Sequence, residues 1–92
     1  MGLENYTIDE FIANYTPKVI GLYERPYDEG VYQTLVEDMV TGVQFDLRFC
    51  DDGSLWFSGD NGYFAYEDYK RIVNNDSVID RTWDAIDRWN NN

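Results

Sequence analysis

The segment VQFDLRFC, residues 43–50, constrains the fold more than any other stretch of this 92-residue chain. Apolar and polar side chains alternate along its whole length, which is the two-residue period of a β-strand with one buried face. Turn signals flank it on both sides, with Gly42 before it and Asp-Asp-Gly at 51–53 after it. A strand between two tight turns has antiparallel neighbours on both sides, so the sequence predicts an antiparallel sheet.

Three further segments complete the predicted sheet. VYQTLVEDMV (31–40) precedes the turn at Thr41-Gly42, and SLWFS (54–58) follows the second turn. VIGLYE (19–24), with its turn-rich exit RPYDEG (25–30), is the fourth strand candidate. We therefore expect a four-stranded antiparallel meander. The loop at Thr41-Gly42 has two or four residues in this interpretation, and the register of the hairpin differs between the two.

Three segments carry helical signals. Residues 7–10 (Thr-Ile-Asp-Glu) form a capping box that starts a short helix, and Pro17 ends it. In residues 65–73 the apolar side chains share one helical face, and a longer amphipathic helix follows from a cap at Asp76 or Ser77. The order α-β-β-β-β-α-α predicts a single α+β domain over residues 1–92, with the helices packed on one face of the sheet.

The net charge of −11 is the most unusual bulk property of the chain. The negative charge is concentrated in residues 26–69, which contain ten acidic side chains and a single basic one, Arg48. Such a surface repels nucleic acids and anionic membranes, and it attracts basic partners. We therefore expect neither direct nucleic-acid binding nor membrane binding.

The chain lacks the residues that several kinds of chemistry require. The chain has no histidine and one cysteine, so it offers neither a zinc site nor a histidine-based catalytic group. An EF-hand loop that began at Asp51 would place Gly53 and Gly62 at two ligand positions. No phosphate-binding glycine motif is present. We therefore predict a protein that is not an enzyme, with no metal site and no cofactor.

The sequence also carries location signals. No run approaches the roughly 18 apolar residues of a spanning helix, and MGLENYTIDE (1–10) resembles no signal peptide. The single Cys50 has no internal partner for a disulfide. These features predict a soluble cytoplasmic protein.

The last helix raises a specific alternative. Its four aspartates, Asp76, Asp80, Asp84 and Asp87, recur about once per helical turn, a spacing that could imitate phosphates. Arg88, however, follows Asp84 by four residues and can pair with it, and residues 70–92 are neutral overall. A solvated helix face is the favoured interpretation there.

The central segment is therefore the candidate binding surface. Its candidate partner-binding residues are the acids Asp28, Glu29, Glu37, Asp38, Asp46, Asp51, Asp52 and Asp60 and the aromatics Tyr27, Tyr32 and Trp56. We expect a non-catalytic acidic protein that occupies a basic protein surface, such as the nucleic-acid-binding channel of a host complex. Phage-type inhibitors that mimic DNA, of the anti-CRISPR or anti-restriction kind, would act in this way. The alternative is a small interaction module that binds through an aromatic sheet face without mimicry.

Overall fold

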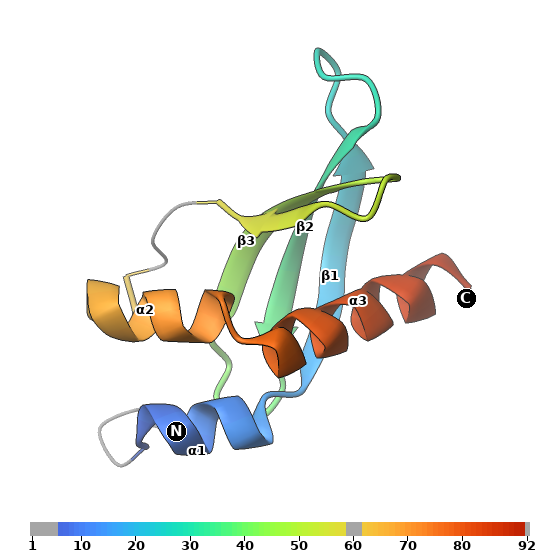
Figure 1. Cartoon of the computed structure of the whole chain (residues 1–92). Helices are drawn as coiled ribbons and strands as arrows, with labels where there is room; N and C mark the ends of the chain where they lie inside the picture. The colour runs from blue at the N-terminus through green and yellow to red at the C-terminus, as the bar shows by residue number, and fades with distance from the viewer. Residues whose placement is uncertain (1–5, 59–61, 92) are drawn as a thin grey trace.

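The computed structural model describes residues 6–58 and 62–91. Within them, four strands form an antiparallel sheet in the order β1-β2-β3-β4 and three helices lie on one side of it (Figure 1). The elements in chain order are α1 (Ile8–Asn14), β1 (Pro17–Glu24), β2 (Val31–Asp38), β3 (Gln44–Cys50), β4 (Leu55–Phe57), α2 (Tyr66–Val73) and α3 (Asp76–Asn90). The predicted α+β class, element order and meander are confirmed.

Some boundaries differ from those that the sequence indicates. Strand β1 begins at Pro17, two residues early, because an edge strand tolerates a first residue that lacks an N–H donor. Four residues separate Asp38 from Val43, whose carbonyl accepts the Asp38 N–H at 2.8 Å, so the longer of the two predicted loops is present. Asn75, not Asp76 or Ser77, caps α3 by accepting the Val78 N–H at 3.1 Å.

The core lies between the sheet and the helices, and Phe45 of β3 is at its centre. This ring contacts Phe11 of α1 and Tyr69 of α2 at centroid distances of 6.1 and 6.5 Å. It also lies 5.5 Å from Phe57 of β4. Because aromatic rings bury a large area per residue, one strand residue joins three other elements.

Strand β1 carries an irregularity between Val19 and Gly21 that turns Ile20 outward to solvent. The Gly21 carbonyl accepts a hydrogen bond of 2.6 Å from the hydroxyl of buried Thr34. This side-chain bond explains why a polar residue is buried at the middle of β2. The bulge also makes β1 a poorer template for pairing with another strand.

Candidate acidic binding surface

The loop after β1 (25–30) and the turn after β3 (51–54) lie at the same end of the sheet. Val31 pairs with Cys50, so the two connections leave neighbouring strand ends. Both extend above α3 in Figure 1. Their acids are Asp28, Glu29, Asp51 and Asp52; together with Glu24, the last residue of β1, we call this set the acidic end of the sheet.

Arg25 is the basic residue of the loop after β1, and its guanidinium is hydrogen-bonded to nearby side chains. Its Nε donates to Asp28 at 2.7 Å, and its Nη1 donates to Gln33 at 2.7 Å. Glu24 accepts the Gly30 N–H at 3.2 Å, which closes the loop. Glu29 is exposed, so the loop presents this carboxylate to solvent while Asp28 is already paired.

The turn after β3 fixes two adjacent carboxylates at the surface. Gly53 has a φ of +96°, a conformation that favours glycine. Asp52 accepts the Ser54 N–H at 2.9 Å, and hydrogen bonds from the Ser54 side chain and backbone lower the pKa of Asp52. Asp51 and Asp52 are both exposed. The residues that the sequence marks as a turn therefore also hold two acids in fixed positions.

The pKa of Tyr32 responds to the negative charges at this end of the sheet. Its ring stacks on Phe49 at a centroid distance of 5.2 Å, with 17° between the planes. The charge of Asp51 raises the pKa of Tyr32, and the charge of Glu24 adds to this effect. Asp51 belongs to the turn after β3 and Glu24 to the end of β1, so carboxylates from two elements act on one phenol.

Replacing Asp51 with asparagine is expected to lower the pKa of Tyr32 toward its ordinary value, because the largest source of repulsion for the phenolate is removed. A pH titration of the Tyr32 ring by NMR measures this directly. Asp46→Asn removes one charge from the opposite sheet face and serves as the control. Equal effects of the two substitutions would contradict a local contribution from Asp51.

The other predicted acids lie elsewhere. Asp38 is 1% exposed and accepts three hydrogen bonds, one from the segment before β1 and two from the loop after β2, so it contributes no carboxylate to the surface. Glu37 accepts from Gln44 at 3.1 Å, and Asp46 accepts from Gln33 at 3.0 Å. Both belong to the sheet face that points away from the helices. Asp60 lies outside the described residues.

The predicted aromatic residues are not brought together. Tyr27 is at the tip of the loop after β1 and is 96% exposed. Tyr32 lies on the helix side of the sheet, against Phe49. Trp56 is 40% exposed on the opposite face, where it pairs with Arg48 of β3. Ile20 and Tyr23 of β1 are exposed too.

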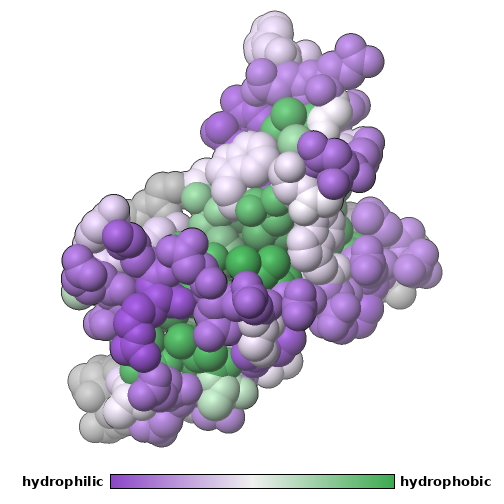
Figure 2. All heavy atoms as spheres, viewed as in Figure 1, coloured by the Kyte–Doolittle hydropathy of each residue, from purple (hydrophilic) through white to green (hydrophobic). Residues whose placement is uncertain are grey.

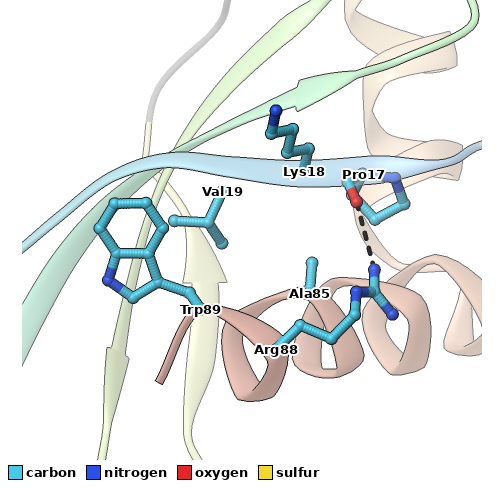
Figure 3. Close-up of a pocket in the computed structure, with 6 residues that line it drawn as sticks. All are labelled: Pro17, Lys18, Val19, Ala85, Arg88 and Trp89. Carbon is cyan, nitrogen blue, oxygen red and sulfur yellow. Dashed lines mark hydrogen bonds between the residues drawn. The ribbon is translucent and has the colours of Figure 1, made fainter. Parts of the chain in front are cut away.

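The prediction that Arg88 neutralises Asp84 is wrong. Its Nη2 instead donates to the Pro17 carbonyl on β1 at 3.4 Å (Figure 3). Arg81 donates to the carbonyls of Ile12 and Tyr15 at 2.6 and 2.7 Å, at the C-terminal end of α1. A backbone carbonyl competes well for a guanidinium when it lacks another donor, as at a helix end.

The arginines of α3 therefore leave its aspartates without a counter-ion. In the part of the chain that the structure describes, the ion pairs are Arg25–Asp28 and Arg71–Asp9, both at 2.7 Å. Asp80, Asp84 and Asp87 are exposed along α3. The sequence does not identify these acids as unpaired, because a spacing of four residues permits pairing but does not show which partner an arginine prefers.

A hollow of about 400 Å³ lies between α3 and the turn after β3. It is lined by Phe49, Cys50, Asp51, Gly53, Trp83, Ile86, Asp87 and Asn90. Figure 2 shows hydrophobic residues that reach the surface above α3. Asp51 of the acidic end and Asp87 of α3 thus border the same apolar depression.

Comparisons with protein-family models, curated proteins and solved structures find no match for this chain. Over residues 6–58 and 62–91, no helix is long and apolar enough to cross a membrane. In the same ranges, no three acidic, cysteine or histidine side chains are grouped as a metal ion requires. The surface itself is therefore the source of the functional inference.

Proposed function

We propose that this protein is a non-catalytic acidic inhibitor that occupies a basic, nucleic-acid-binding surface of another protein. One observation carries the proposal: among the residues that the structure describes, the exposed carboxylates of the acidic end and of α3 form no ion pair other than Arg25–Asp28. Carboxylates that are already paired offer little attraction, whereas unpaired ones raise both the affinity and the association rate for a basic surface.

The geometry supports mimicry of a nucleic acid in particular. Asp80, Asp84 and Asp87 project along one exposed helix at intervals of about one turn, roughly 5.4 Å. The hollow lined by Asp51 and Asp87 connects this row with the acidic end. A basic channel that accepts a row of phosphates would find a comparable row of negative charges here.

The test is capture of the partner from the native host by the tagged chain. We expect capture to be lost as salt rises from about 0.1 M to about 1 M, since the Debye length falls from about 10 to about 3 Å. Added duplex DNA should displace the captured protein, because both ligands need the same basic surface.

Matched variants locate the interaction. Changing Asp51, Asp52 and Asp87 to asparagine is expected to weaken capture by at least about tenfold, because unscreened charge pairs at an interface are worth about 1 kcal/mol or more each. The control changes Asp46 and Asp68 to asparagine and Glu67 to glutamine, which removes the same charge from other surfaces. If both sets weaken capture equally, or if neither does, the proposal fails.

A second candidate function rests on the uncovered sheet face. Ile20, Tyr23 and Trp56 are 40–54% exposed there. The charges on this face balance, with Lys18 and Arg48 against Glu37 and Asp46. A neutral face with aromatic side chains suits an ordinary protein partner. In that case Tyr23→Ala and Trp56→Ala abolish capture, and salt has little effect.

A further inference from the structure

We propose that the hollow between α3 and the turn after β3 receives an arginine side chain of the partner. This proposal rests on the proposed function, since it names the group that the acidic surface recognises. It concerns one depression with an apolar floor, whereas the proposed function requires only that the whole acidic surface meets a basic one.

The floor of the hollow is aromatic and held in place. Phe49 is 6% exposed and Ile86 is 1% exposed, while Trp83 is half-buried. The indole of Trp83 meets Phe49 edge-on, with 5.4 Å between ring centroids and 74° between the planes. Tyr32 stacks on Phe49, so three rings from β2, β3 and α3 form a continuous series. A fixed indole bordering an open hollow is a favourable surface for a cation.

The rim supplies negative charge from two elements. Asp51 comes from the turn after β3, which is closed by the Cys50 N–H to the Ser54 carbonyl at 3.0 Å. Asp87 comes from α3, and the neighbouring Arg88 is bonded to Pro17. Both carboxylates are exposed beside the apolar floor. Each can accept hydrogen bonds from a donor that lies over the rings.

Arginine fits this combination better than other cations. Its guanidinium is planar and weakly hydrated, so it stacks on an aromatic ring while its edges donate to carboxylates. A lysine ammonium is compact and strongly hydrated, and it gains less from an apolar floor. A divalent cation needs several oxygen ligands, and the described residues that line the hollow offer two carboxylates.

The neighbouring groove in Figure 3 provides an internal comparison. It lies between β1 and the end of α3, and it also contains a tryptophan, Trp89. Its lining includes Lys18 and Arg88, however, so its charge opposes the approach of an arginine. Trp56, on the uncovered sheet face, is a second comparison. The chain therefore carries one tryptophan in the proposed site and two outside it.

The experiment uses the full ¹⁵N-labelled chain, titrated with a blocked tri-arginine peptide and with a blocked tri-lysine peptide. We expect the indole N–H signal of Trp83 and the amide signals of residues 51–53 to shift, while the indole signals of Trp56 and Trp89 do not. Tri-arginine should reach half-saturation at about a threefold lower concentration than tri-lysine, because of its stacking contribution.

Paired variants test the rim. Changing Asp51 and Asp87 to asparagine should weaken tri-arginine binding by about fivefold relative to the Asp46→Asn, Glu67→Gln control, which removes two exposed charges outside the hollow. All four side chains are exposed, so both proteins should fold.

Two results would overturn the proposed arginine site. One is a set of shifts centred on Trp56 or Trp89. The other is an equal loss of binding in both pairs of variants. If either is found while the chain still captures its partner in a salt-sensitive, DNA-competed manner, the arginine site fails and the proposed function stands. If capture itself is insensitive to salt, the proposed function fails.

Discussion

Alanine in place of Asp38 lowers the free energy of unfolding by about 2–4 kcal/mol, because it removes the acceptor of three part-buried hydrogen bonds. The Asp38 carboxylate accepts the N–H of Thr16 at 2.9 Å, and it accepts the N–H and hydroxyl of Thr41 at 3.1 and 2.6 Å. It thus joins the segment before β1 to the loop after β2. Without it, two backbone N–H groups lose their partner in a part-buried position.

Urea unfolding measures this loss, with Asp46→Ala as the control. Asp46 is exposed, so its replacement is expected to change stability by no more than about 0.5 kcal/mol. Similar stability of the two variants would show that Asp38 is not the structural carboxylate described here. The comparison also separates an acid that holds the fold from the acids that are proposed to bind a partner.

Alkaline pH destabilises the fold through Tyr15, by about 3 kcal/mol in total as the pH rises from well below 10 to well above 12. Burial raises the pKa of Tyr15 from its usual 10.0 to about 12. The Asp38 charge adds to the increase, and the Arg81 charge opposes it. The unfolded chain loses the phenol proton near pH 10 and the folded chain near pH 12, so the stability is complete below pH 10 and declines above it.

The hydrogen-bond network identifies which group donates. The Thr82 hydroxyl donates to the Val78 carbonyl at 2.7 Å, so its single proton is used. Tyr15 therefore donates to Thr82 across 2.9 Å, and its deprotonation breaks this bond. Tyr15→Phe removes the titrating group, and its unfolding free energy should fall less steeply above pH 10 than that of the native chain. Parallel pH profiles for the two proteins would contradict the assignment.

The fold can be predicted from the sequence because the signals for its strands, helices and turns are local. Alternation in β3, the capping box of α1 and glycine turns such as Gly42 each depend on a few neighbouring residues. The cap that the sequence predicts for α3, Asp76 or Ser77, is one or two residues late, because Asn75, Asp76 and Ser77 are all good capping residues.

The candidate site is harder to predict from the sequence, because it depends on contacts between residues that are far apart in the chain. Asp38 and Asp51 look alike in the sequence, yet one closes a buried network and the other lies at the surface. Arg81 and Arg88 could have paired with neighbouring aspartates, but carbonyls of Tyr15 and Pro17, more than 60 residues away, hold them. Local spacing gives no information about such competition.

The bonds from Arg81 to α1 have a consequence for the order in which the chain assembles. Helix α1 has seven residues, too few to persist alone, and its C-terminal carbonyls are held by a side chain near the other end of the sequence. During synthesis the sheet residues emerge before α3, so α1 lacks this support until the final helix is made. We therefore expect α1 to gain this support only once α3 has docked, so that the two helices form cooperatively.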